Sequence, residues 1–210
     1  RGLRTPLLVG DLPFGSYQRS DEQAIDTAIR FVKEAGCEGV KLEGGQWAAN
    51  RARAMVDAGI PVMGHVGLTP QTAVSLGGFR AQGRTAEAAR RLLEDALAIQ
   101  DAGCFSIVFE AMPAEVAAEI MEHMRVPVIG IGAGGSTDGQ VLVVHDMLGI
   151  QEAIQPKFVK RYAHVRPLMI EATRAFAAEV RDRSFPAPEH EYAMAPEELE
   201  RFRGPTATEG

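Results

Sequence analysis

The sequence of 210 residues has few cysteines, no excess of basic residues and no long apolar run. Its two cysteines, Cys37 and Cys104, lack CxxC or any other metal-type spacing, so we expect reduced, partly buried thiols in a cytoplasmic protein. The longest apolar runs, such as residues 126–131, are far too short to span a bilayer, and no secretory signal opens the sequence. A net charge of -6 argues against nucleic acid or an anionic membrane as a partner.

The apolar residues that are present form short Val- and Ile-rich runs, which alternate with segments of helical period. Such alternation is typical of βαβ units that build a parallel sheet. The predicted strands are residues 7–9, 40–42, 61–65, 106–109, 126–131 and 141–144, and the predicted helices are residues 21–35, 46–58, 85–102 and 114–124. Six strands leave two α/β architectures open, a doubly wound sheet and part of a (β/α)8 barrel, which needs eight.

The composition changes after residue 185, where proline, glutamate and arginine become frequent. Only residues 196–202 have a helical pattern in this part of the sequence. We therefore expect residues 1–185 to form the catalytic domain and residues 186–210 to form a surface tail.

Ionisable residues stand at the ends of several predicted strands. Asp11, Glu43 and Glu110 come directly after apolar runs, and His65 closes another run. Because the carboxyl ends of parallel strands meet at one rim of a barrel, these side chains are expected to converge there. Carboxylates suit a hard cation, and Mg²⁺ typically takes one or two of them beside water and substrate. Acidic residues also often begin loops, so the pattern indicates a metal-assisted barrel enzyme without naming its reaction.

Lys41 interrupts a predicted buried strand, where an unpaired ammonium group would be costly. Glu43 lies two residues further along and therefore on the same side of the strand. A structural pair between the two side chains is one interpretation. A lysine that faces an anionic substrate is the other, and the position of Lys41 at a strand end favours it.

The segment 130–135 matches the pattern GxGxxG and follows a predicted strand. A dinucleotide site also needs a helix directly after the glycines and an acidic residue about 20 positions further on. Another short apolar run follows here instead, so we reject that interpretation. The loop after a late barrel strand can bind phosphate, which leaves a phosphosugar enzyme open; otherwise the segment is a tight turn near the substrate.

Several local motifs, in one consistent order, resemble those of the ketopantoate hydroxymethyltransferase family. They are Gly-Asp-Leu-Pro-Phe at residues 10–14, Val-Lys-Leu-Glu-Gly-Gly at 40–45, Gly-His-Val-Gly-Leu-Thr-Pro-Gln at 64–71, Gly-Gly-Phe-Arg-Ala-Gln-Gly-Arg at 77–84, Pro-Val-Ile-Gly-Ile-Gly-Ala-Gly at 127–134 and Asp-Gly-Gln at 138–140. The resemblance extends from about residue 2 to residue 192 without large gaps.

The resemblance implies a (β/α)8 TIM barrel of the phosphoenolpyruvate mutase and isocitrate lyase type. The family's enzymes transfer a one-carbon unit from 5,10-methylenetetrahydrofolate to 3-methyl-2-oxobutanoate, giving 2-dehydropantoate for pantothenate and coenzyme A biosynthesis. They are magnesium-dependent and form large homo-oligomers such as decamers. The resemblance places the family's metal ligands on Asp11 and Glu43, its substrate-binding residues on Asp11, Lys41 and His65, and its catalytic carboxylate on Glu110. It assigns no folate-contacting residue.

The sequence departs from the family pattern at its beginning. The family has two earlier strands, and the second carries a Gly-Asp-Ser motif at the metal and substrate site. We therefore expect this chain to supply strands 3–8 of the barrel and, on its own, to be unstable or inactive. Two other functions stay open: a magnesium-dependent lyase or mutase on the same barrel, and an inactive assembly partner. Neither cysteine stands in the reactive-loop motif usual for such lyases, which counts against the first.

Overall fold

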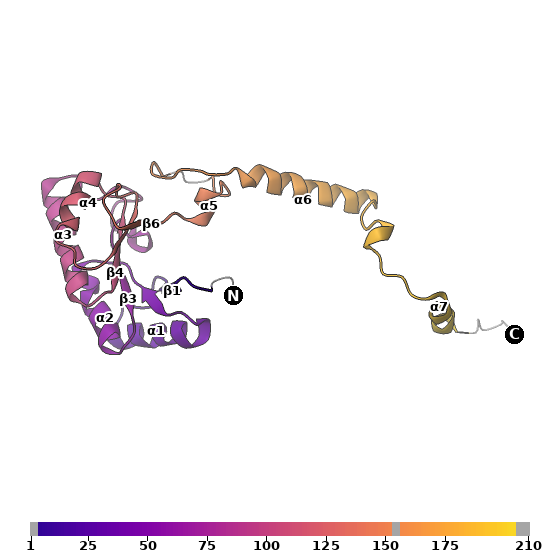
Figure 1. Ribbon diagram of the computed structural model, residues 1–210, viewed down its shortest axis with the longest axis horizontal. Coiled ribbons are helices and arrows are strands. Elements are labelled where there is room, and N and C mark those ends of the chain that lie inside the picture. Colours follow the sequence, from indigo (N-terminus) through magenta and orange to yellow (C-terminus); the bar gives the residue numbers. More distant parts are fainter. Residues whose placement is uncertain (1–3, 153–155, 205–210) are drawn as a thin grey trace.

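The computed structural model describes residues 4–152 and 156–204. Its six strands form one sheet in which every strand pairs in parallel with the next one along the chain (Figure 1). The strands are β1 Val9–Asp11, β2 Gly39–Lys41, β3 Val62–Gly67, β4 Ser106–Glu110, β5 Val128–Ile131 and β6 Gly139–Gln140. A doubly wound sheet reverses its strand order at a switch point, and this sheet does not. The order therefore confirms the predicted α/β class and identifies an arc of a β/α barrel rather than a doubly wound sheet.

Four helices cover the outer face of the arc. They are α1 Asp21–Ala35, α2 Gln46–Asp57, α3 Ala86–Asp101 and α4 Ala114–Met121, and each packs on the next (Figure 1). The side chain of Ser20 starts α1 by accepting a hydrogen bond from the Gln23 amide, and Gly36 ends it in the left-handed conformation. These local signals explain why the predicted helix 21–35 coincides with α1, and the predicted helix 46–58 also lies close to α2.

The core lies between the strands and these helices. Val62, Ile107 and Phe109 on the strands are fully buried, as are Met55 and Ile99 on the helices. Complete burial of one such side chain stabilises the fold by about 1.5–3 kcal/mol. The strands are thereby held in a fixed register, so the side chains at their carboxyl ends keep fixed relative positions.

The predicted strand at residues 141–144 is wrong. Pairing with β5 occurs instead at β6, because Asp138 accepts a hydrogen bond from the Val128 amide and aligns Gly139 beside Ile129. The apolar run that follows is about half exposed and enters the short helix α5, Val144–Met147. The valine-rich run predicted a strand here, but no layer of the described residues covers the run, so it is not buried as a strand of the sheet would be.

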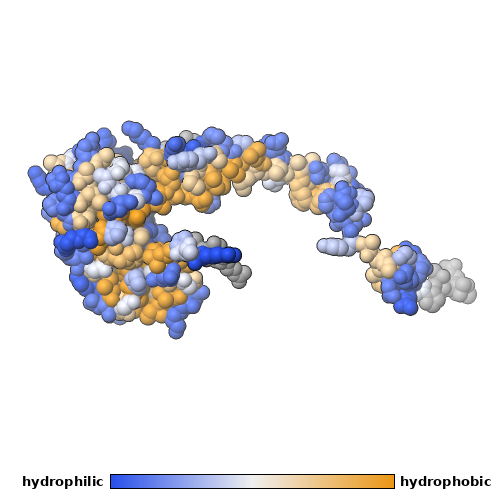
Figure 2. Space-filling view, in the orientation of Figure 1, coloured by the Kyte–Doolittle hydropathy of each residue, from blue (hydrophilic) through white to orange (hydrophobic). Residues whose placement is uncertain are grey.

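Beyond α5 the chain leaves the sheet. The long helix α6, Val165–Asp182, projects away from the strands and has no buried residue (Figure 1). Apolar side chains gather along one side of it (Figure 2), and its exposed hydrophobic residues include Leu168 and Phe176. The turn Pro188–His190 and helix α7, Pro196–Arg203, follow, the latter close to its predicted place. The division into a domain of residues 1–185 and a tail stays a prediction. Within the described ranges, no helix combines the length and apolarity needed to cross a membrane.

Candidate active site

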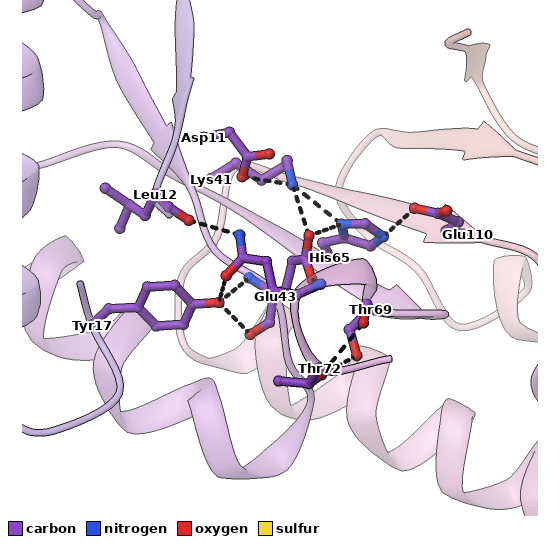
Figure 3. A network of polar contacts seen from close by, with 10 residues as sticks. Asp11, Leu12, Tyr17, Lys41, Glu43, His65, Thr69, Thr72 and Glu110 are labelled. Atoms are coloured by element: carbon purple, nitrogen blue, oxygen red, sulfur yellow. Dashed lines mark hydrogen bonds and ion pairs between the residues drawn. The ribbon is translucent and has the colours of Figure 1, made fainter. Parts of the chain in front are cut away.

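The five residues predicted for the site come together at one rim of the sheet. Asp11 ends β1, Lys41 ends β2 directly beside it, and Glu110 ends β4. Glu43 follows β2, and His65 lies within β3. Figure 3 shows their side chains pointing toward one another. This convergence follows from parallel pairing, because each strand delivers its carboxyl end to the same edge.

Lys41 is the centre of the cluster. Its Nζ lies 2.8 Å from Asp11 Oδ1, 3.9 Å from Glu43 Oε1 and 3.2 Å from His65 Nδ1. The side chain is 17% exposed, so the ammonium group is largely withdrawn from water but compensated by two carboxylates. The contact with Glu43 confirms that the two side chains share one side of the strand. Lys41 carries one positive charge, whereas the ionised carboxylates of Asp11 and Glu43 carry two negative charges. The two carboxylates can therefore also face a second cation.

His65 connects Lys41 to Glu110. A lysine ammonium group can only donate, so its contact with Nδ1 makes that nitrogen the acceptor and places the ring proton on Nε2. Nε2 lies 3.0 Å from Glu110 Oε2, and both side chains are largely buried. The alignment of this contact falls short of a hydrogen bond, and Nε2 has no other partner in residues 4–152 and 156–204. Glu110 therefore has a neighbouring proton donor but keeps capacity for a further ligand.

Glu43 is held by two residues that the sequence did not single out as site residues, Tyr17 and Gln71. The Gln71 amide donates to Glu43 Oε2 at 2.9 Å, and the Glu43 amide donates to Tyr17 Oη at 3.2 Å. Gln71 Oε1 lies 2.9 Å from the same hydroxyl, and Gln71 Nε2 donates to the Leu12 carbonyl at 2.8 Å. Tyr17 is fully buried and stacks on Trp47. The network fixes the Glu43 backbone and one of its carboxylate oxygens, leaving Oε1 on the Lys41 side.

Burial determines the protonation of this network. It raises the pKa of Glu43, an effect opposed by the hydrogen bond from the Gln71 backbone amide and by the charge of Lys41. It also raises the pKa of Tyr17 to about 12. The tyrosine therefore keeps its proton near neutral pH and acts only as a fixed hydrogen-bonding group. A cation placed beside Glu43 would favour its ionised form.

The donor atoms fit a magnesium ion. Asp11 Oδ1 and Glu43 Oε1 both lie close to the Lys41 ammonium group. Carboxylate oxygens of this kind are the ligands that Mg²⁺ prefers. No group of three or more His, Cys, Asp or Glu side chains in the described part of the chain forms a ready-made metal site. An ion bound here would complete its coordination with substrate and water oxygens, which is usual for Mg²⁺.

Within the part of the chain that the structure describes, two cavities open at this rim, and Glu110 is the one residue that lines both. The first has a volume of about 520 Å³ and is lined by Asp11, Lys41, Glu43 and His65 together with apolar residues such as Val108. The second, of about 770 Å³, lies on the other side of Glu110 and borders Gly132 and Gly134 of the glycine-rich loop. The loop therefore borders a cavity, and the choice between a phosphate-binding loop and a tight turn near the substrate stays a prediction.

Neither cysteine is placed to act as a nucleophile at the rim. Cys37 and Cys104 are buried, and burial raises the pKa of the Cys104 thiol to about 12. His123 and His145 are exposed and line neither cavity. Where Asp11, Glu43 and Glu110 converge, the available chemistry is therefore that of these three carboxylates with Lys41 and His65 on a β/α scaffold.

These features define a β/α-barrel protein with a carboxylate-rich site suited to a divalent cation and an anionic substrate. Residues 1–188 match the sequence profile of the ketopantoate hydroxymethyltransferase family. The 3-methyl-2-oxobutanoate hydroxymethyltransferase of Oleidesulfovibrio alaskensis is 52% identical over 202 residues, which are 96% of this chain and 70% of that protein. The enzyme of the same name from Heliobacterium modesticaldum is 55% identical over 194 residues, which are 92% of this chain and 70% of that protein. The chain belongs to the ketopantoate hydroxymethyltransferase family.

Solved structures of lower similarity share the general arrangement. Phosphonopyruvate hydrolase has 11% identity and a TM-score of 0.48, with 93% of this chain and 68% of that chain covered. For a putative lyase/mutase from Burkholderia cenocepacia J2315 the identity is 17% and the TM-score 0.44, with 93% of this chain and 69% of that chain covered. The fold described above rests on strand order and direction, not on these likenesses.

Proposed function

We propose that the site of this chain transfers a hydroxymethyl group from 5,10-methylenetetrahydrofolate to 3-methyl-2-oxobutanoate, giving 2-dehydropantoate. Family membership supports the reaction. The structural observation that carries it is the convergence of Asp11, Lys41, Glu43, His65 and Glu110 on one rim, with Glu110 between two cavities. A transfer between two substrates needs two adjoining spaces and a proton-transferring group where they meet.

The smaller cavity has the chemistry to hold the oxoacid. Asp11 and Glu43 would bind Mg²⁺, which when present supplies a Lewis acid for the carboxylate and 2-oxo oxygens of the substrate. Lys41 would orient the substrate's negative charge from the same side. Val108, Ile129 and Ile131, on β4 and β5, line the same cavity and suit the branched hydrocarbon end. The cavity therefore offers charged groups for the carboxylate and 2-oxo oxygens and apolar surface for the hydrocarbon end.

Glu110 is the proposed proton-transfer group. The reaction breaks the C3–H bond of the oxoacid and forms a C–C bond to the methylene carbon. Both C–N bonds that hold this carbon in the folate break, water supplies the hydroxyl group of the product, and the two folate nitrogens take up the C3 proton and the second proton of the water. Glu110 borders the spaces of both partners and therefore reaches either the oxoacid carbon or a folate nitrogen. His65, with its Nε2 at 3.0 Å, would hold the carboxylate oriented between them.

The proposal is tested by exchanging Glu110 for glutamine. Glu110→Gln keeps the shape of the side chain but removes its basicity, and loss of such a group costs about 100-fold to 10,000-fold in turnover. Glu119→Gln, the same change at an exposed position on α4, is the matched control. In the chain preceded by the two strands that the family resemblance predicts, we expect Glu110→Gln to bind the oxoacid and to lose most turnover, while the control keeps both. Normal turnover of Glu110→Gln would assign the proton transfer to another group.

Three broader properties belong to the same proposal. The rim carboxylates support magnesium as the physiological ion, to be checked by removing divalent cations and adding Mg²⁺ back. The exposed apolar side of α6 supports homo-oligomerisation, which the mass in solution would measure. A cytoplasmic location is proposed from the family's role in the synthesis of pantothenate.

A further inference from the structure

The larger cavity has no role in binding the oxoacid as proposed above. It is bounded by the carboxyl ends of β4 and β5, by residues 79–84 ahead of α3 and by residues 156–158. Its volume of about 770 Å³ falls within the range of about 300–1,000 Å³ typical of sites for small organic molecules. It is larger than the oxoacid cavity beside it, so it can take the bulkier of two reaction partners.

Among the described residues, three basic side chains line this cavity, namely Arg80, Arg84 and Lys157, and Glu110 is its one acidic residue. No carboxylate of residues 4–152 and 156–204 forms an ion pair with any of the three. Most arginine ion pairs in the described residues lie at the surface, as the pair of Arg91 with Glu87 does. Three cations without carboxylate partners around one concave space attract an anionic ligand.

The walls of the cavity are apolar and partly aromatic. Phe79 and Phe158 contribute rings, and Leu68 and Met112 contribute aliphatic surface. Phe158 is held in place by packing against Leu68 and by the close approach of Gly132, where an added Cβ would lie 2.4 Å from the ring. An aromatic wall beside a group of cations suits a ligand with flat rings at one end and carboxylates at the other.

The position of Glu110 gives the orientation of such a ligand. Because Glu110 is common to both cavities, the reacting part of a molecule in the larger one must lie at Glu110, facing the oxoacid. Building on the function proposed above, we propose that the larger cavity binds the folate co-substrate. Its ring system packs against Phe158 with the reactive methylene near Glu110, and its glutamyl carboxylates contact Arg80, Arg84 and Lys157.

The inference is tested by calorimetric binding of tetrahydrofolate, which does not require turnover. We expect the double variant Arg80→Ala with Arg84→Ala to bind at least about tenfold more weakly, equivalent to about 1.4 kcal/mol. The single variant Lys157→Ala should also weaken binding, and added salt should weaken binding to the wild-type protein more than to the variants. Arg90→Ala removes an exposed arginine of α3 that lines neither cavity, and it should bind as the wild type does.

Turnover measurements separate this inference from the reaction itself. In the double variant the KM for methylenetetrahydrofolate should rise while the KM for the oxoacid stays the same. If the wild-type protein forms 2-dehydropantoate and the double variant binds tetrahydrofolate normally, the cavity assignment is wrong and the reaction stands. If the wild-type chain, preceded by the two strands that the family resemblance predicts, forms no product while the double variant loses tetrahydrofolate binding, the cavity assignment stands and the proposed reaction is overturned.

Discussion

Replacing Tyr17 with phenylalanine removes one hydroxyl group from a fully buried position beside the metal-site carboxylate. That hydroxyl accepts from the Glu43 amide at 3.2 Å and lies 2.9 Å from Gln71 Oε1. Each lost hydrogen bond costs about 0.5–1.5 kcal/mol, and a buried donor left without a partner costs about 1–3 kcal/mol. We therefore expect Tyr17→Phe to lower the free energy of unfolding by about 2–3 kcal/mol, a large share of a typical total of about 5–15 kcal/mol.

The same change should also affect the site. Gln71 would lose one of the contacts that hold its amide against Glu43 Oε2, so that carboxylate becomes less ordered. Urea unfolding gives the stability, and the Mg²⁺ concentration needed for half-maximal turnover gives the effect on the site. Tyr192→Phe is the control, since Tyr192 is fully exposed. A Tyr17→Phe protein as stable as Tyr192→Phe, with unchanged Mg²⁺ dependence, would refute the role of the network.

Two further changes test the packing of Gly132 against Phe158 and the effect of burial on the carboxylate of Asp95. Gly132→Ala should destabilise the protein by about 1–3 kcal/mol in thermal or urea unfolding, because φ is +67° and the new Cβ meets Phe158, whereas Gly135→Ala, with open space around it, should not. Burial raises the pKa of Asp95 above its ordinary value of 3.8, so ionisation of this carboxyl group opposes folding. The free energy of unfolding of the wild-type protein should therefore fall relative to that of Asp95→Asn as the pH rises from 3.8 through the raised pKa. A constant difference between the two proteins across this pH range would contradict the assigned effect of burial.

The sequence was sufficient to predict five of the six strands close to their observed places, together with the ionisable residues at their ends. The apolar runs before Asp11, Glu43 and Glu110 mark strands that are buried on a parallel sheet, and parallel pairing then brings their ends to one rim. The run at residues 141–144 gave the same signal and was misread. This run lies beyond the Asp138 contact and is exposed in the folded chain. Exposure of this kind depends on tertiary structure, which a local sequence pattern does not contain.

The supporting residues of the site could not be read from the sequence for a related reason. Tyr17 and Gln71 are 54 positions apart, and neither follows a strand in a pattern that indicates chemistry. The basic cavity combines Arg80 and Arg84 with Lys157, which lies much later in the chain. Gln71 and the two arginines fall within motifs that resemble the family, but the motifs do not say what those side chains contact.

The most direct test of the proposed function is the formation of 2-dehydropantoate from 3-methyl-2-oxobutanoate and methylenetetrahydrofolate, measured with and without Mg²⁺. Because the chain spans 70% of the length of the Oleidesulfovibrio relative, the assay includes this chain and the same chain preceded by the two strands that the family resemblance predicts. The account predicts magnesium-dependent product in the extended chain. Absence of product in both chains, with Mg²⁺ present and that relative active in the same assay, would contradict it.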